Sequence, residues 1–171
     1  IGGKACGASN QATFERKNPL DGSVATRAPA ATVEDALRAC EAAAAALPVW
    51  SQMGPNARRA LLMKASHALE AKGEAIAAAM AVETGASGIW AGFNVHLSAS
   101  MLLEAASLTT QINGEIIPSD VPGSVAMAVR QPAGVVLGIA PWNAPVILAV
   151  RSISTALACG NTVILKGSEL C

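Results

Sequence analysis

Neither sign of charge dominates this sequence, and it has no long, uninterrupted apolar run. The 171 residues include 12 basic and 12 acidic side chains, so the formal net charge is zero. A nucleic-acid-binding protein would show a basic excess, and a membrane-surface protein a polybasic patch. The longest candidate for a membrane span, residues 133–150, is interrupted by glycines, prolines and Asn143. We therefore expect neither a nucleic-acid partner nor a membrane partner.

Sequence motifs for metal binding, redox chemistry and export are also missing. The four cysteines form no Cys-x-x-Cys pair of the kind that holds zinc or cycles between thiol and disulfide. His67 and His96 have no carboxylate or thiol placed to make either one a general base. The first four residues, Ile-Gly-Gly-Lys, lack an apolar signal core. We expect no metal site, free thiols and a cytoplasmic location.

An N-terminal hairpin and a layer of helices are predicted for residues 1–112. The turn residues from Asn18 to Gly22 separate two short segments with strand character. Alanine supplies most of the 52% hydrophobic content and favours helix. Hydrophobic periodicity and helix-end signals predict helices over residues 32–46, 55–72, 73–83 and 87–109.

Helix-end signals predict where the first two helices begin and end, and the positions of charged residues predict which side chains face solvent. Thr32 and Asp35 have the spacing of a capping box, and Pro48 is expected to end the first helix. In the second helix, we expect Leu62 on the apolar face and Arg58 away from it. The charged residues of both helices are expected to be solvated.

The pattern changes to strands after residue 112. Two strand-like segments within residues 113–131 flank a Ser-Asp-Val-Pro-Gly turn. Residues 134–140 form a β-branched apolar run that we expect to be buried on both faces, and residues 162–165 form another. Pro145 suits the start of a helix between them, and Gly160 suits its end. This βαβ unit predicts an α/β fold with a Rossmann-like parallel sheet.

Polar side chains follow both predicted strands at their carboxyl ends, where open α/β sheets bind ligands. Trp142 and Asn143 follow the first strand, and Lys166 and Glu169 follow the second. The first turn has no Gly-x-Gly-x-x-Gly, which a classical dinucleotide-binding turn needs. The residues alone therefore predict a polar ligand edge without naming its ligand.

Three segments, taken in order, resemble one known family. They are Pro132–Val136, the turn Pro141–Pro145 and Ala158–Lys166. Together they resemble the NAD(P)-dependent aldehyde dehydrogenase superfamily, which has this turn in place of the glycine motif. The resemblance implies the N-terminal part of that fold and extends over essentially the whole chain from Asn18. It implies a hairpin and helical part of the cofactor-binding domain at 1–112, bridging oligomerisation strands at 113–131, and an incomplete first βαβ unit at 132–171, with the catalytic domain absent from this chain.

The resemblance assigns roles to the strand-end residues. Asn143 matches the asparagine whose side-chain amide stabilises the oxyanion formed when a thiolate attacks an aldehyde. A lone asparagine could instead form a hydrogen bond with the backbone of its own turn. Lys166 and Glu169 match positions that bind the adenosine ribose hydroxyls. Because the carboxylate would repel a 2′-phosphate, NAD is expected rather than NADP. For these two residues, the alternatives are a solvated strand-end charge and a polar helix-terminal residue.

The wall of the cofactor and substrate sites is also implied by the resemblance. The positions expected beneath the nicotinamide ribose are Ile139, Ala140, Pro141 and Trp142. The alternative for Trp142 is core packing. The helix around Trp90 resembles the bacterial salicylaldehyde and vanillin dehydrogenase branch, in which it borders the aldehyde tunnel. Trp90 and Arg151 would suit a ring bearing hydroxyl or methoxyl groups, although they could be a core residue and a helix-surface charge.

The resemblance implies NAD-dependent oxidation of an aromatic, salicylaldehyde- or vanillin-like aldehyde to its carboxylic acid. The reaction would pass through a thiohemiacetal and thioester on a cysteine downstream of Cys171. Neither Cys159 nor Cys171 matches that nucleophile, so the chain alone is expected to be inactive and poorly stable. The full-length enzyme is expected to be a homodimer or homotetramer. The alternatives are an inactive truncated remnant or assembly module, and an acylating or phosphate-substrate member of the superfamily.

Overall fold

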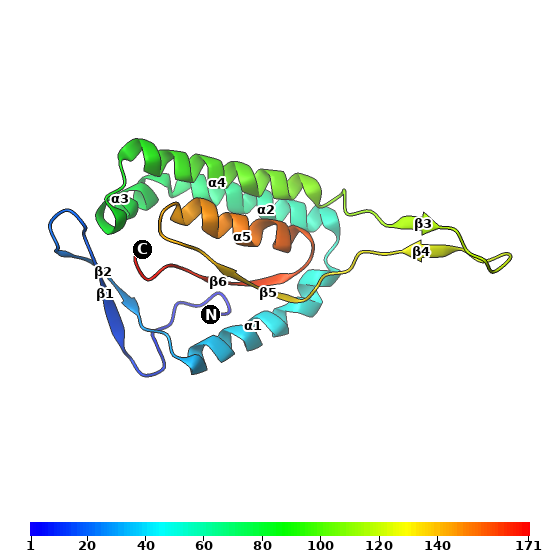
Figure 1. Cartoon of the computed structure of the whole chain (residues 1–171), viewed down its shortest axis with the longest axis horizontal. Helices are drawn as coiled ribbons and strands as arrows, with labels where there is room; N and C mark the ends of the chain where they lie inside the picture. The colour runs from blue at the N-terminus through cyan, green and yellow to red at the C-terminus, as the bar shows by residue number, and fades with distance from the viewer.

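A parallel pair of strands joined by a crossover helix lies at the centre of the molecule, in a computed structural model that describes residues 1–171 (Figure 1). Strands β5 (Val135–Ile139) and β6 (Thr162–Lys166) pair along their whole length, and helix α5 (Pro145–Ala158) connects them. Gly160 turns the chain from α5 into β6 with a left-handed φ of 84°. The predicted βαβ unit and α/β fold class are confirmed.

The remaining helices cover this unit from two sides. In Figure 1, α5 lies above the two strands and α1 below them, chiefly against β6. Helices α2 and α4 pack outside α5, and α3 packs on α4. The helix bounds are α1 Val33–Gln52, α2 Pro55–Ala71, α3 Gly73–Thr84 and α4 Gly88–Leu108. None of the helices is both long and apolar enough to span a membrane.

The hydrophobic core lies where α2, α4 and α5 meet. Its buried members are Leu62, Leu102, Ala105, Ala106, Val150 and Ala158. Alanines at these helix contacts let the backbones approach closely, so a layer with few large side chains still excludes water. The predicted apolar position of Leu62 is confirmed.

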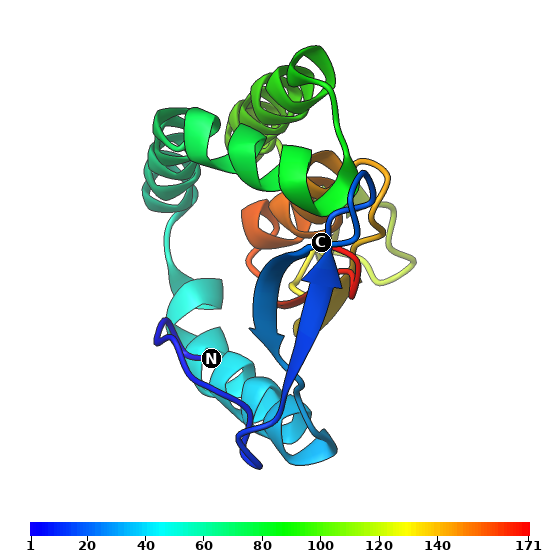
Figure 2. The same ribbon diagram turned by 90° about the vertical axis from the view of Figure 1, so that its left-hand side faces the viewer.

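Each end of the molecule carries an antiparallel hairpin. Strands β1 (Thr13–Lys17) and β2 (Val24–Pro29) pair beside the C-terminus, as Figure 2 shows. Strands β3 (Glu115–Ile117) and β4 (Ala126–Ala128) pair over three residues each and project away from the body (Figure 1). Both hairpins occur where the sequence predicts them.

The N-terminus of α1 has the predicted capping box. The amide of Asp35 donates to Thr32 Oγ1 over 3.3 Å, and the amide of Thr32 donates to Asp35 Oδ2 over 2.9 Å. The carboxylate also accepts from the amide of Ser9 and is 4% exposed, so it is not solvated as expected. The hydrogen bonds from the Thr32 and Ser9 amides lower the pKa of Asp35.

Helix α1 does not end before Pro48 as predicted; it continues to Gln52. A proline inside a helix removes one backbone hydrogen bond, and its ring crowds the carbonyl four residues earlier, so the helix continues only where other contacts hold the following turn. Here that turn carries Trp50, whose Nε1–H donates to the carbonyl of Leu157 over 3.1 Å.

The prediction that Arg58 lies away from the apolar face is wrong. The residue is 9% exposed, and its Nε–H donates to the carbonyl of Ala158 over 3.1 Å. Its Nη1 also donates to the carbonyl of Met53. Ala158 is the last residue of α5 and Met53 the C-cap of α1, so both carbonyls lack the partner that a continuing helix would supply. The guanidinium thus supplies a hydrogen-bond donor to unpaired carbonyls at the ends of two helices, α1 and α5.

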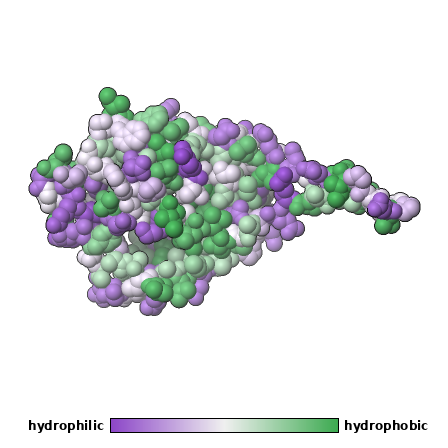
Figure 3. Space-filling view, in the orientation of Figure 1, coloured by the Kyte–Doolittle hydropathy of each residue, from purple (hydrophilic) through white to green (hydrophobic).

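Strand β5 is not buried on both faces as predicted. Val135, Leu137 and Ile139 are 41%, 59% and 63% exposed. Gly138, which faces α5, is buried. Burial on both faces requires a covering element on each side, and α1 lies mainly beneath β6. Figure 3 shows apolar residues gathered over the strands on this face of the molecule.

We expect Arg58→Ala to destabilise the protein by about 2 to 4 kcal/mol, because it leaves two partly or fully buried carbonyls without a donor. Calorimetric or denaturant unfolding of the full-length protein would measure the loss. The control is Arg59→Ala, which removes a neighbouring arginine that is exposed. Equal effects of the two substitutions would show that the contacts of Arg58 contribute nothing.

Candidate functional site

The two parallel strands end at a common edge, where the predicted ligand-binding loops begin. Ile139 lies opposite Lys166, and the amide of Ala140 donates to the carbonyl of Lys166 over 3.0 Å. The loops 141–144 and 167–171 leave the sheet from this point. The structure therefore brings the residues predicted from both strand ends to one edge of the sheet.

Asn143 lies in the first of these loops and is exposed. Its side-chain amide makes no hydrogen bond within the chain, while its backbone carbonyl accepts a hydrogen bond from Trp90 Nε1 over 3.2 Å. The side chain therefore does not hydrogen-bond to the backbone of its own turn, which is the structural alternative to an oxyanion role. Both amide hydrogens of Asn143 remain available to a ligand.

Trp90 reaches this loop from the first turn of α4. Its amide donates to the N-cap hydroxyl of Ser87 over 3.3 Å, and its ring stacks on Phe93 with centroids 5.6 Å apart. The side chains of Trp90 and Phe93 are both partly exposed, at 41% and 46%. Trp90 is therefore not a core residue, and an aromatic pair flanks Asn143.

Lys166 and Glu169 form an exposed ion pair in the second loop. The Lys166 ammonium lies 3.5 Å from Glu169 Oε2 and donates to the carbonyl of Gly167 over 3.1 Å. The backbone amide of Glu169 itself, and then the charge of Lys166, lower the pKa of the Glu169 carboxyl. It is therefore ionised at neutral pH. With 58% and 73% of these side chains exposed, a ligand can reach both charges.

Trp142 faces a cleft between the two strand-end loops and the N-terminal hairpin. This cleft has a volume of about 360 Å³ and is also lined by Glu169, Arg16 and Glu83. Trp142 is 51% exposed, so it is not packed in the core. Of the other positions expected to line the cofactor, Ile139 and Pro141 are exposed, whereas Ala140 is 4% exposed.

Arg16 is a structural support of this edge that sequence reasoning missed. Its Nη2 donates to the carbonyl of Ser168 over 3.3 Å, and its Nη1 lies 3.7 Å from the carboxylate of Glu83. Glu83 also accepts a hydrogen bond from the hydroxyl of Thr26. The hairpin thus holds the loop that carries Glu169. No local pattern could reveal a contact between residues 152 positions apart.

Cys171 also lies at this edge, where it lines a pocket with Pro141 and Ser168, whereas Arg151 and Cys159 line neither this pocket nor the Trp142 cleft. Arg151 is exposed on α5 and makes no ion pair or side-chain hydrogen bond with the other candidate residues. Cys159 and Cys171 are free thiols, and burial, followed by the charge of Glu83, raises the pKa of Cys171. A raised pKa disfavours the thiolate, in keeping with the expectation that Cys171 is not a nucleophile.

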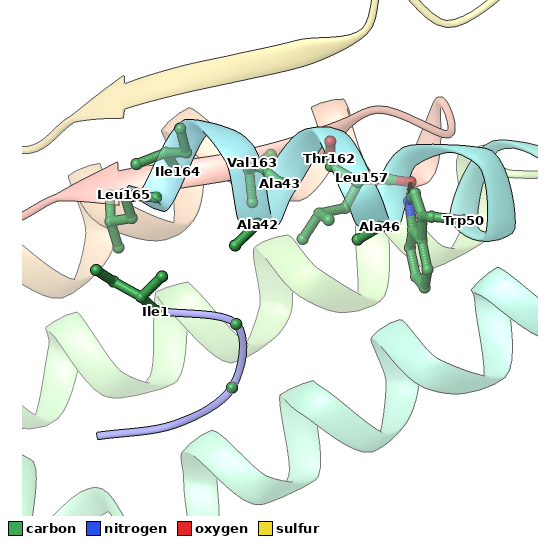
Figure 4. A pocket seen from close by; sticks show the side chains of 13 residues that line it. Ile1, Ala42, Ala43, Ala46, Trp50, Leu157, Thr162, Val163, Ile164 and Leu165 are labelled. Carbon is green, nitrogen blue, oxygen red and sulfur yellow. Dashed lines mark hydrogen bonds between the residues drawn. The ribbon is translucent and has the colours of Figure 1, made fainter. Parts of the chain in front are cut away.

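A cavity larger than the Trp142 cleft lies outside the strand-end loops. It is a groove of about 520 Å³ between α1, β6 and the first three residues, as Figure 4 shows. Its lining is mostly apolar and includes Trp50 and Leu157, but none of the candidate site residues. Its size does not make it the reactive site, because it lacks convergent polar groups.

Known proteins resemble the chain over nearly all of its length. A vanillin dehydrogenase from Pseudomonas sp. (strain HR199) is 61% identical over 170 residues, covering 99% of this chain and 35% of the relative. The crystal structure of a salicylaldehyde dehydrogenase from Pseudomonas putida G7, complexed with salicylaldehyde, has a TM-score of 0.95 at 48% identity. The matched region covers 98% of this chain and 34% of that one.

A structure with lower identity superposes almost as closely. The NAD-dependent benzaldehyde dehydrogenase from Corynebacterium glutamicum has a TM-score of 0.93 at 33% identity, over 98% of this chain and 37% of that one. The chain spans about a third of the length of the curated relatives it matches (35% for the vanillin dehydrogenase).

The Aldehyde dehydrogenase family profile matches residues 7–171. The fold, the order of the strand-end motifs and these relatives agree with the resemblance seen in the sequence, including its salicylaldehyde and vanillin dehydrogenase branch. The chain belongs to the aldehyde dehydrogenase family and corresponds to the N-terminal portion of its fold.

Proposed function

We propose that the full-length protein oxidises an aromatic aldehyde to its carboxylic acid with NAD as the cofactor. The observation that carries this proposal is the unpaired side-chain amide of Asn143 beside the exposed aromatic pair of Trp90 and Phe93. The vanillin and salicylaldehyde dehydrogenases at 61% and 50% identity support an aromatic substrate.

Asn143 is suited to stabilise negative charge on the aldehyde oxygen. When a nucleophile adds to the carbonyl carbon, the oxygen gains charge, and a fixed N–H donor stabilises that charge more than it stabilises the ground-state carbonyl. The Asn143 amide is free to donate because no group in the chain engages it. Neither Cys159 nor Cys171 is proposed as the nucleophile, and we assign that role to a cysteine downstream of residue 171.

The charged pair Lys166 and Glu169 fits the hydroxyls of an adenosine ribose. The ammonium can donate and the carboxylate can accept, and both side chains are exposed at the carboxyl edge of the sheet. Ile139, Ala140, Pro141 and Trp142 would line the nicotinamide side of the same edge. When bound, NAD accepts the hydride released from the oxidised aldehyde carbon. Because Glu169 is ionised at neutral pH, it would repel a 2′-phosphate, which favours NAD over NADP.

We assign the wall of the aldehyde pocket to Trp90, with Arg151 as a second candidate. The half-exposed Trp90 ring offers an aromatic surface next to Asn143. Stacking on such a surface suits a benzaldehyde-type ring. Arg151 is supported only by its exposure on α5, which begins directly after the Asn143 turn.

We also propose that the full-length protein is a homodimer or homotetramer in which residues 113–131 join the subunits. In the chain, these residues separate the hairpin and helical part of the cofactor-binding domain, at 1–112, from its first βαβ unit, at 132–171. The β3–β4 hairpin leaves Ile116, Val125, Met127 and Val129 exposed by 66% to 79%. An apolar, two-stranded arm of this kind is stable only against another surface. The four free cysteines are compatible with the cytoplasmic location that we include in the proposal.

Asn143→Ala in the full-length protein should lower kcat by about a hundredfold or more, because an oxyanion donor is lost. Binding of NAD should be unchanged, which titration of the protein with the cofactor would show. Asn56→Ala, a substitution of an exposed asparagine on α2, is the matched control. A variant at position 143 that keeps the full kcat would remove the oxyanion role.

Lys166→Ala should weaken NAD binding by about tenfold, because it removes a charged hydrogen-bond donor. Glu169→Gln should narrow the preference for NAD over NADP, since it removes the charge that repels the 2′-phosphate. Equilibrium binding of both cofactors would measure these effects, with the exposed Lys64→Ala as control. Unchanged affinity of the Lys166 variant for NAD would rule out its proposed contact.

The isolated chain of residues 1–171 should form no NADH from NAD and an aldehyde, because it supplies an oxyanion donor without the proposed nucleophile. Absorbance at the NADH band during incubation with vanillin or salicylaldehyde is a direct assay. Turnover that depends on the aldehyde would contradict the assignment of the nucleophile to a residue beyond the chain.

A further inference from the structure

The turn that carries Asn143 has few internal restraints. Among the residues Pro141, Trp142 and Asn143, the single hydrogen bond within the chain is the one from Trp90 Nε1 to the Asn143 carbonyl. Regular helical bonding begins only at Ala144, whose carbonyl accepts from the amide of Leu148. The conformation of the turn therefore depends on its prolines, its packing and this one contact.

The donor of that contact is itself firmly held. The backbone of Trp90 is fixed by the Ser87 N-cap, and its carbonyl accepts from the buried Asn94 side chain over 3.0 Å. Phe93 stacks against the indole at an interplanar angle of 25°. An indole N–H can only donate, so the contact has a fixed polarity. Trp90 thus presents a well-supported donor from α4 to a turn that makes no other hydrogen bond within the chain.

We propose that Trp90 is a positioning residue for Asn143, in addition to forming part of the pocket wall. Its N–H fixes the peptide plane that follows Asn143 and thereby the direction in which the Asn143 side chain leaves the backbone. This inference rests on the proposed oxyanion role of Asn143. Small displacements of a catalytic group are costly, because the donor must meet the developing charge at hydrogen-bond distance.

The two roles of Trp90 predict different kinetic changes. Loss of the pocket wall weakens aldehyde binding and raises KM. Loss of the N–H alone misdirects the oxyanion donor, which acts in the transition state, and therefore lowers kcat. A substitution that removes the N–H but keeps the ring separates these effects.

The experiment uses the full-length enzyme with Trp90→Phe and with the benzothiophene analogue of tryptophan at position 90. The analogue keeps the size and stacking of the indole but has sulfur in place of the N–H. We expect the analogue to lower kcat by about tenfold and to leave the KM for vanillin within about twofold. If Trp90→Phe fails to fold, the analogue by itself tests the positioning role of Trp90.

Trp50 provides a matched control. It also donates its indole N–H to a backbone carbonyl, that of Leu157, over 3.1 Å, but it lies in the apolar groove away from the strand-end edge. Trp50→Phe should lower the thermal midpoint and leave kcat unchanged. Unchanged kcat in the position-90 analogue, or an equal fall in kcat for both tryptophans, would overturn the positioning role.

A double-variant comparison separates this inference from the proposed function. If Trp90 acts through Asn143, adding the position-90 analogue to Asn143→Ala causes no further fall in kcat. A full additional tenfold fall would refute the coupling while leaving the oxyanion role of Asn143 intact. Unchanged kcat in Asn143→Ala alone would instead refute the oxyanion role, and the positioning role with it.

Discussion

The parallel pairing of β5 with β6 is the constraint on which the candidate site depends. Two parallel neighbours cannot be joined by a tight turn, so the chain must cross back over the sheet as α5. The crossover needs a close fit: a Cβ on Gly138 would come within 2.4 Å of Ser152 Oγ. Because both strands then end at the same edge, the Asn143 loop and the Lys166 loop become neighbours. The chemistry proposed at this edge is a consequence of that pairing.

The helical layer holds the crossover helix α5 in place by polar contacts at helix ends as well as by apolar packing. Arg58 supplies donors to the final carbonyls of α1 and α5, and Trp50 donates to the last turn of α5. The core between α2, α4 and α5 contains several alanines and few large side chains. In such a core, buried hydrogen bonds at helix ends decide which helices meet and at what point along their lengths.

Features with a local cause could be predicted from the sequence. The Thr32 cap, the Gly160 turn and the two strands of the βαβ unit each depend on residues a few positions apart. The burial of Arg58 and the extension of α1 past Pro48 could not be predicted, because both depend on carbonyls of α5, about a hundred residues later for Arg58. At the candidate site, the motif predicted Asn143, Lys166 and Glu169, and the structure brings their loops to one edge of the sheet. The Trp90 and Arg16 contacts required the folded chain, since α4 and the hairpin are remote in sequence from the loops they support.

The long-range contact of the N-terminal hairpin has a consequence for how the protein is made. The hairpin leaves the ribosome before the helices and the sheet that it contacts, and its arginine can meet Glu83 once α3 has formed. The hairpin lies beside the C-terminus (Figure 2), and its contact with Ser168 spans 152 positions and must wait until the end of β6 has emerged. Closing so long a loop costs entropy that only the finished βαβ unit can offset. The hairpin, although synthesised before the helices and the sheet, is therefore among the last elements to be fixed in place, and it contacts the loop of Glu169 only after the sheet edge exists.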